Sequence, residues 1–110
     1  MLEFFKHIFA KAEYDLEGET FKQKFLEDGS NAVLLDVRTQ SEFAHGTIKG
    51  SKNIDFYSNT FNAKISSLDK SKTYYVFCRS GNRSGKACSL MTDMGMKAYN
   101  LDGGIGAWPG

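Results

Sequence analysis

The chain has 110 residues, and its 14 lysines and arginines against 13 aspartates and glutamates leave a formal net charge of +1. This balance excludes a strongly basic molecule, so we expect no nucleic-acid partner. The length predicts one domain, and 25 Leu, Ile, Val and Phe residues are too many for an intrinsically disordered chain. No apolar run approaches the roughly 20 residues of a membrane-spanning helix, so we expect no membrane span.

The cysteines and histidines do not predict a metal centre or a disulfide framework. Cys78 and Cys88 lie ten residues apart and form no C-x-x-C pair, and His7 and His45 lack ligand spacing. We therefore expect no metal and no cofactor. Charged residues interrupt the first dozen positions, which argues against a secretory leader, and few cysteines are typical of a reducing compartment. These features favour a cytoplasmic protein.

Residues 1–12 are interpreted as an amphipathic N-terminal helix or extension, and residues 13–110 as the domain proper. Leu2, Phe5, Ile8 and Phe9 recur at helical spacing and give this leader one apolar face. That face is predicted to pack on the domain's own core, with a docking surface for another protein or a weak membrane contact as alternatives.

The first half of the domain predicts a helix, a buried strand and a short helical turn. Thr20 is predicted to cap a helix that includes Phe21 and Phe25 and stops at Gly29. Residues 32–37 form an apolar run that ends in charge, as expected of a parallel strand buried on both faces. A short helical turn around residues 41–43 and a loop with a brief strand over residues 46–54 follow.

The second half alternates helix and strand again. A helix is predicted around residues 61–68, a β-rich strand at Thr73–Phe77, and a helix over residues 87–94 that stops at Gly95. Lys97–Leu101 is the last predicted strand. The economical architecture is an α/β fold in which helices cover both faces of a mostly parallel central sheet.

Cys78 is the predicted nucleophile. It directly follows a predicted strand and precedes a helix, and ligands of open parallel sheets bind beyond the carboxyl ends of the strands. The residues after it are small or polar, so successive backbone N–H groups can point at one spot and form an anion-binding nest at the positive end of the helix. The predicted binding residues are Arg79, Ser80, Gly81, Asn82, Arg83 and Ser84.

Positive charge is concentrated around this cysteine. Residues 70–92 carry five basic and no acidic side chains, so the rest of the chain has a charge of −4. Two of the three arginines, Arg79 and Arg83, lie within five residues of Cys78. Such surroundings lower a thiol pKa from about 8.5 to roughly 3.5 to 7.5.

By contrast, Cys88 lies on the apolar side of a helix and is predicted to pack there, with a resolving thiol as the alternative.

Two stretches together resemble a single-domain rhodanese-like sulfurtransferase, from about residue 15 onward. The first comprises residues 34–38, Glu42-Phe43 and residues 46–54; the second comprises residues 78–87, followed by Leu90, Gly95, Leu101, Gly103-Gly104 and Trp108. The sequence departs from the family at Thr47, where His is usual, and at Ser51, where Ala is usual.

The resemblance implies that a persulfide forms on Cys78. A small anionic donor such as thiosulfate would give up its sulfane sulfur, and a thiol or cyanide would collect it; a sulfur donor or acceptor protein is a further implied partner. Arg79 and Arg83 would attract the donor. Supporting roles in holding the loop and strand ends are assigned to Asp36, Arg38 and Glu42.

Two other functions remain open at this stage. Cysteine-dependent phosphatases and arsenate reductases also use a thiolate in an anion-binding loop, but the phosphatases resemble a pattern with five residues between Cys and Arg. Here four residues separate Cys78 from Arg83, which gives a tighter cup. The second alternative is a noncatalytic rhodanese-like module that only binds a partner; such modules usually lack the cysteine.

Overall fold

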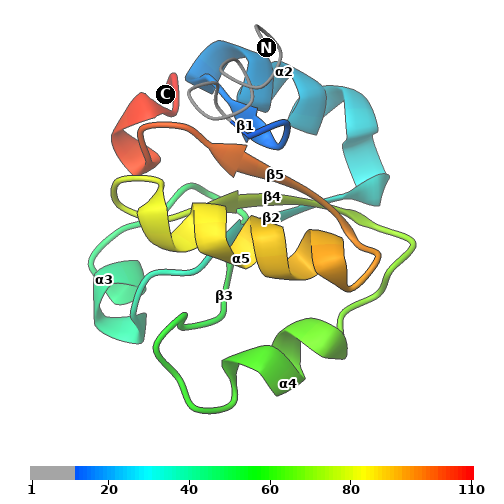
Figure 1. Ribbon diagram of the computed structural model, residues 1–110. Coiled ribbons are helices and arrows are strands. Elements are labelled where there is room, and N and C mark those ends of the chain that lie inside the picture. Colours follow the sequence, from blue (N-terminus) through cyan, green and yellow to red (C-terminus); the bar gives the residue numbers. More distant parts are fainter. Residues whose placement is uncertain (1–11) are drawn as a thin grey trace, which may run out of the picture.

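A five-stranded parallel sheet forms the centre of the molecule. The computed structural model describes residues 12–110, in which the strand order is β1-β5-β4-β2-β3 (Figure 1). All four neighbouring pairs run parallel, as the sequence predicts. The strands are β1 (Asp15–Leu16), β2 (Ala32–Asp36), β3 (Lys52–Asn53), β4 (Thr73–Phe77) and β5 (Lys97–Leu101). Because all strands point the same way, their carboxyl ends meet at one edge.

The strands agree closely with the sequence prediction, except for β1. Strands β4 and β5 begin and end where predicted, and β2 ends one residue early, at Asp36. The two-residue strand β1 was not predicted. It pairs with the end of β5 through Asp15↔Asn100 and Leu16↔Leu101. A strand this short has no periodicity of its own, so only its partner strand defines it.

Within residues 12–110, four α-helices and one 3-10 turn connect the strands, and a second 3-10 turn follows the last strand. They are α2 (Gly18–Asp28), α3 (Gln40–Ala44), α4 (Phe61–Ser66), α5 (Asn82–Asp93), η1 (Gly29–Asn31) and η2 (Ile105–Ala107). Helix α2 stops at Gly29 as predicted, but the prediction that Thr20 caps it is wrong. Glu17 occupies the cap, and Thr20 lies inside the first turn. The first helical residue, Gly18, lies against the segment after β5, where a Cβ atom would be 1.9 Å from the Ala107 carbonyl oxygen.

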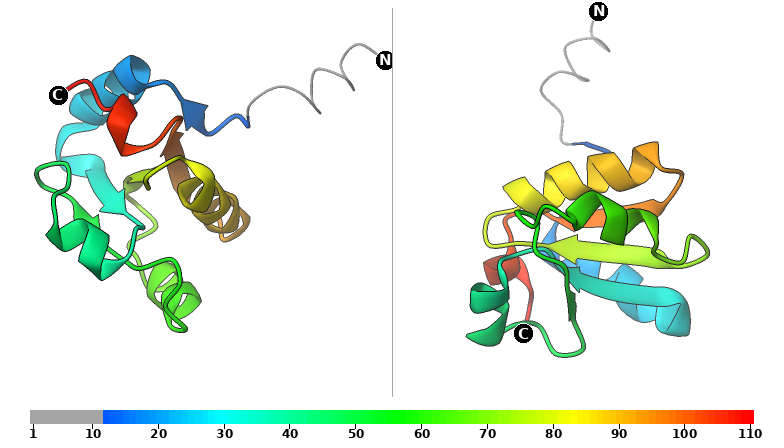
Figure 2. Two further views of the ribbon diagram at one scale, coloured as in Figure 1. Left: turned by 90° about the vertical axis from the view of Figure 1, so that its left-hand side faces the viewer. Right: turned by 90° about the horizontal axis from the view of Figure 1, so that it is seen from below.

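Each face of the sheet is covered by its own apolar core. Figure 2 shows α4 and α5 on one face and α2 with η2 on the other. On the α5 face, Ile65 and Met91 pack against Val76, and all three are fully buried. On the α2 face, Phe21 meets Tyr75 and Trp108 edge to face, with ring centroids 5.4 and 6.1 Å apart. The sheet is therefore buried on both sides, which explains the uninterrupted apolar strands.

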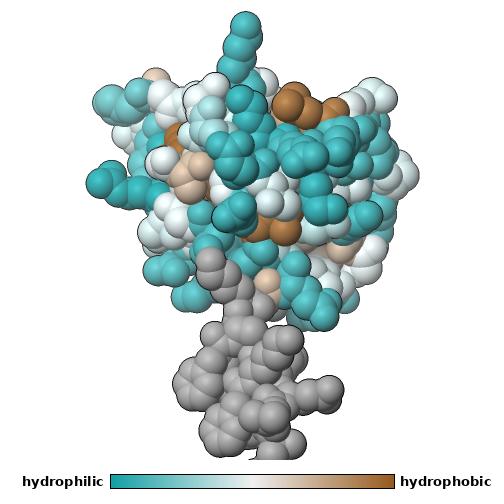
Figure 3. Space-filling model, turned by 90° about the horizontal axis from the view of Figure 1, so that it is seen from above, coloured by the Kyte–Doolittle hydropathy of each residue, from teal (hydrophilic) through white to brown (hydrophobic). Residues whose placement is uncertain are grey.

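The surface over α2 and β1 is mainly hydrophilic, with small separate apolar patches (Figure 3). Among residues 12–110, Leu26 and Tyr57 are the large apolar side chains that stay exposed, at 62% and 69%. No helix in this part of the chain is long and apolar enough to cross a membrane. The predicted leader helix lies outside the described residues, apart from Ala12, which leaves that prediction open.

Candidate active site

The loop after β4 curls around Cys78. Cys78 directly follows the last residue of the strand, and α5 begins at Asn82. Gly81 makes the turn between them, with a φ of 96° in the left-handed region that favours glycine. Because the chain reverses within three residues, the first N–H groups of α5 face back toward the end of β4.

Three hydrogen-bond donors converge on the Cys78 sulfur. The backbone N–H of Gly81 donates to Sγ at 3.1 Å, and that of Ser84 at 3.4 Å. The Ser84 hydroxyl donates to the same atom at 3.2 Å. Both Cys78 and Ser84 are fully buried. The sulfur is thus enclosed by donors that already point at it before any substrate binds.

This arrangement favours the thiolate form of Cys78. Burial acts to raise the pKa of the thiol, because an apolar interior disfavours charge. The hydrogen bonds from the Ser84 side chain and from the backbone of Ser84 and Gly81 act in the opposite direction. With a smaller contribution from the nearby Ser80 backbone N–H they outweigh burial, so the pKa lies below its usual value. The dipole of the 12-residue helix α5 has its positive end at the same place.

Cys88 occupies a different environment in the same core. It is fully buried on α5, packed with the apolar side chains that cover the sheet. Burial, followed by the negative charge of Asp15 and of Cys78, raises the pKa of the Cys88 thiol. This thiol stays protonated at neutral pH, which makes it a poor nucleophile. The structure thus places Cys88 in the packed interior of the domain.

Asp36 and Arg38 form a buried ion pair at the end of β2. The Arg38 guanidinium contacts the Asp36 carboxylate at 2.7 Å and also donates to the Gly46 carbonyl at 2.6 Å. The Thr47 hydroxyl donates to the same carboxylate at 2.9 Å. The pair therefore ties the strand end to the loop at residues 46–47.

Glu42 and Arg83 link helix α3 to the start of α5. Two guanidinium nitrogens of Arg83 donate to the two Glu42 oxygens at 2.8 and 3.2 Å. Hydrogen bonds from Arg83, with those from the Thr39 cap, outweigh burial and lower the pKa of Glu42 to about 2. The Tyr57 ring lies on Arg83 at 5.5 Å from its centroid. The charge of Arg83 is thus largely matched by Glu42.

The other predicted binding residues lie on the outer side of the loop. Arg79, Ser80 and Asn82 are exposed. Within residues 12–110, the Arg79 side chain makes no hydrogen bond or ion pair, so it presents an unmatched guanidinium next to the cysteine in sequence. The structure therefore separates the two arginines, which the sequence analysis assigned to one role.

The carboxyl-terminal segment supports the loop through backbone contacts. The Ile105 N–H donates to the Cys78 carbonyl at 2.8 Å. Gly104 allows this approach, because a Cβ atom there would lie 1.8 Å from the Arg79 carbonyl oxygen, and its φ is 81°. The glycine pair that the sequence analysis noted only as a family motif is therefore in direct contact with the cysteine loop.

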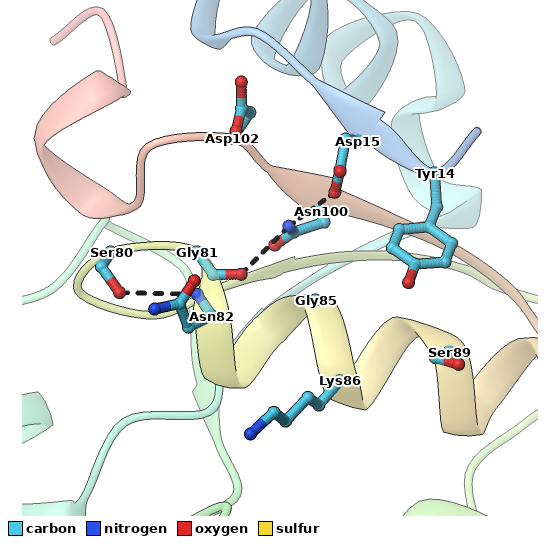
Figure 4. A pocket seen from close by; sticks show the side chains of 10 residues that line it. All are labelled: Tyr14, Asp15, Ser80, Gly81, Asn82, Gly85, Lys86, Ser89, Asn100 and Asp102. Atoms are coloured by element: carbon cyan, nitrogen blue, oxygen red, sulfur yellow. Dashed lines mark hydrogen bonds between the residues drawn. The ribbon is translucent and has the colours of Figure 1, made fainter. Parts of the chain in front are cut away.

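A polar cleft of about 410 Å³ lies beside the loop (Figure 4). Its lining residues come from β1 and the residue before it, the end of β5 and the residue after it, the loop and α5: Tyr14, Asp15, Ser80, Gly81, Asn82, Gly85, Lys86, Ser89, Asn100 and Asp102. Asp15 and Asn100 were not predicted from the sequence. No local signal marks them, because they approach the loop only when β1 pairs with β5.

In the described part of the chain, no cluster of His, Cys, Asp and Glu is arranged to hold a metal ion.

Comparison with known proteins identifies the family. The family model of the rhodanese-like domain matches residues 19–110. The chain belongs to the rhodanese-like family. It is 32% identical over 95 residues to a sulfurtransferase of Allochromatium vinosum, covering 86% of each chain. It is 36% identical over 78 residues to the thiosulfate sulfurtransferase GlpE of Pseudomonas fluorescens, covering 70% of each.

A solved rhodanese-like structure has the same fold. The crystal structure of a rhodanese-like domain protein from Staphylococcus aureus matches with a TM-score of 0.73 and 33% identity, covering 86% of this chain and 89% of that one.

The two departures from the rhodanese-like pattern are accommodated locally. Thr47 bonds to Asp36, and the Ser51 hydroxyl donates to the Ile48 carbonyl at 2.6 Å. Neither residue contacts the Cys78 sulfur.

Proposed function

We propose that this rhodanese-like protein is a sulfurtransferase that moves a sulfane sulfur from thiosulfate or a persulfide donor to cyanide or a thiol, through a persulfide on Cys78. The observation that carries the proposal is the set of three donors on Sγ, at 3.1, 3.2 and 3.4 Å. These donors stabilise a sulfur anion at neutral pH, which both a thiolate nucleophile and an anionic persulfide require.

In the first step, the Cys78 thiolate attacks the outer sulfur of thiosulfate. A sulfur–sulfur bond forms to Sγ while the sulfur–sulfur bond of thiosulfate breaks, and sulfite leaves with the electron pair. This is thiol–disulfide exchange chemistry, in which an acidic leaving group departs quickly. The terminal sulfur of the new persulfide carries the negative charge.

In the second step, cyanide or a thiolate attacks the terminal sulfur of the persulfide. The bond to Sγ breaks, and Cys78 leaves as a thiolate with the bonding electrons. The products are thiocyanate or a new persulfide on the acceptor. The donors from Gly81 and Ser84 serve both steps, because Sγ is anionic before the first and after the second.

The test is the intact mass of the reduced protein after incubation with thiosulfate. We expect a gain of one sulfur atom that disappears when cyanide is added, with thiocyanate released. Cys78→Ser should show no gain. Cys88→Ala should keep most of the activity, because Cys88 is fully buried and contributes packing; its cost is about 1 kcal/mol of unfolding free energy.

An assay with an aryl phosphate on the same samples distinguishes the phosphatase alternative. Phosphate release that depends on Cys78, without sulfur uptake, would replace the sulfurtransferase proposal. Binding of a partner protein with neither activity would support the noncatalytic module. An equal loss of activity in Cys78→Ser and Cys88→Ala would contradict the packing role of Cys88.

A further inference from the structure

The Asn100 side chain forms a hydrogen bond to the backbone of the loop that follows Cys78. It lies on β5 and is 3% exposed. Its Nδ2 donates to Asp15 Oδ1 at 2.8 Å and to the Gly81 carbonyl oxygen at 3.2 Å. Figure 4 shows the amide between the β1 carboxylate and the loop. One side chain therefore connects the outermost strand of the sheet to the residue that caps α5.

The orientation of this amide is determined by its two partners. Both are oxygen acceptors, so the nitrogen must face them; a flipped amide would place Oδ1 against two other oxygens. Oδ1 is then left buried without a hydrogen-bond partner in residues 12–110. A buried, unpaired acceptor disfavours folding. Stability alone therefore gives a weak reason for Asn at this position.

Gly81 is the residue through which Asn100 acts. The Gly81 N–H donates to Cys78 Sγ, and its carbonyl accepts the first hydrogen bond of α5, from Gly85 N at 2.9 Å. Glycine moves freely about φ and ψ, so a loop that turns on it needs an external restraint to hold its N–H in place. The second hydrogen bond to this carbonyl, from Asn100, supplies such a restraint.

We propose that Asn100, oriented by Asp15, is a positioning residue that keeps the Gly81 N–H directed at the Cys78 sulfur. This inference rests on the proposed function, in which Cys78 reacts as a thiolate. Asn100 does not contact Sγ and takes no part in bond making. By holding the Gly81 N–H in place, Asn100 makes the Cys78 thiol more acidic. It also restricts the loop before the reaction, so less conformational freedom is lost when the persulfide forms.

The test compares the thiol pKa of wild type and Asn100→Leu, measured from the pH dependence of the alkylation rate by iodoacetamide in a Cys88→Ala background. We expect Asn100→Leu to raise the Cys78 pKa by about 0.5 to 1, because one of three donors is loosened. Below the thiol pKa, alkylation and sulfur uptake should slow by about threefold to tenfold, and the rates should converge at high pH.

Tyr74→Phe is the matched control. The Tyr74 hydroxyl donates to the Asp69 carbonyl at 2.7 Å, so this variant also removes a hydrogen bond from a buried side chain to the backbone, away from the loop. It should leave the thiol pKa unchanged.

Asn100→Leu also removes the unpaired Oδ1, so the melting temperature of Asn100→Leu should change by no more than about 5 °C.

An unchanged thiol pKa in Asn100→Leu overturns the positioning role, as does a shift of equal size in Tyr74→Phe. If Asn100→Leu does not fold, a comparison of Asp15→Ala with Asp15→Asn provides the test. Both remove the negative charge, but only Asp15→Ala removes the oxygen acceptor that orients the amide, so the thiol pKa should be higher in Asp15→Ala than in Asp15→Asn. Alkylation requires no sulfur donor. A wild-type protein that takes up sulfur neither from thiosulfate nor from a small-molecule persulfide would therefore refute the proposed function, while the pKa comparison would still decide the role of Asn100.

Discussion

The two cysteines show how the surroundings of a residue determine its chemistry. Both are fully buried in the same apolar core. Three donors point at the sulfur of Cys78 and lower its pKa despite burial, whereas burial raises the pKa of Cys88. Burial disfavours the thiolate at both positions, so the difference comes from the hydrogen bonds to Cys78 and from the negative charges near Cys88.

The lowered pKa of Cys78 predicts a pH dependence of stability. Between the folded pKa and the unfolded value of about 8.5, the unfolded chain binds one proton more than the folded chain. The stabilisation by Cys78 is therefore gained as the pH rises through this window and lost as it falls through the folded pKa. Urea unfolding under reducing conditions should show the difference between wild type and Cys78→Ser growing with pH. A difference that does not vary with pH contradicts the assignment.

At the scale of elements, the loop is held by close contact with the segment that follows β5. The Ile105 N–H donates to the Cys78 carbonyl, and Gly104 lies against the Arg79 backbone. These contacts join the carboxyl ends of β4 and β5, which are neighbours in the sheet. The geometry of the loop therefore depends on two elements that are separated by the whole of α5.

Gly104→Ala should disrupt this support. Its Cβ would overlap the Arg79 carbonyl at 1.8 Å in a backbone conformation with φ of 81°. We expect a loss of about 3 kcal/mol or more in unfolding free energy and a rise in the Cys78 pKa, measured by urea unfolding and alkylation. Gly106→Ala is the control, because a Cβ at Gly106 meets no atom within 4 Å. Similar behaviour of the two variants would show that the close contact is unimportant.

The Glu42–Arg83 pair joins α3 to α5 and offsets positive charge near the loop. Its bonds of 2.8 and 3.2 Å hold both partners charged, with the Glu42 pKa lowered to about 2 by Arg83. Removing either partner should therefore change the attraction for an anionic donor, in opposite directions. The unmatched guanidinium of Arg79 should retain part of this attraction in both variants.

We expect Arg83→Ala to raise the KM for thiosulfate about two- to fivefold and to raise the thiol pKa. Glu42→Gln should lower the KM by a similar factor, because Gln still accepts a hydrogen bond but no longer neutralises Arg83. Both effects should shrink at high salt. Steady-state kinetics at two ionic strengths provide the measurement. A KM that moves the same way in both variants would show that the pair acts only through structure.

At the scale of the whole molecule, the parallel sheet brings distant residues to one edge. Asp36, Cys78 and Leu101 end or follow three adjacent strands, and the loops after them build the candidate site. Helices and apolar cores cover both faces of the sheet, so ligands can reach the sheet only at its edge, where the loops are exposed. This arrangement is why Cys78 could be assigned to the candidate site from its position after a predicted strand.

The sequence by itself determined the alternation of strands and helices, the buried central strands, and Cys78 with its basic glycine-bearing loop. These features are local: apolar runs, helical spacing and residues adjacent in the chain carry them. The loop is a short contiguous segment, so its composition was enough to predict that it could bind an anion. The rhodanese-like resemblance depended on the same contiguous motifs.

Only the tertiary structure decided β1, the start of α2 at Gly18, the pairing of Arg83 with Glu42, and the contact of Asn100 with Gly81. Each of these depends on residues far apart in the chain: 41 positions separate Glu42 from Arg83, and 19 separate Gly81 from Asn100. Side-chain partners at such separations are chosen by the packing of the whole sheet, and no local pattern encodes them. For this reason the sequence predicted which sulfur is the candidate nucleophile, while only the fold shows which groups contact it.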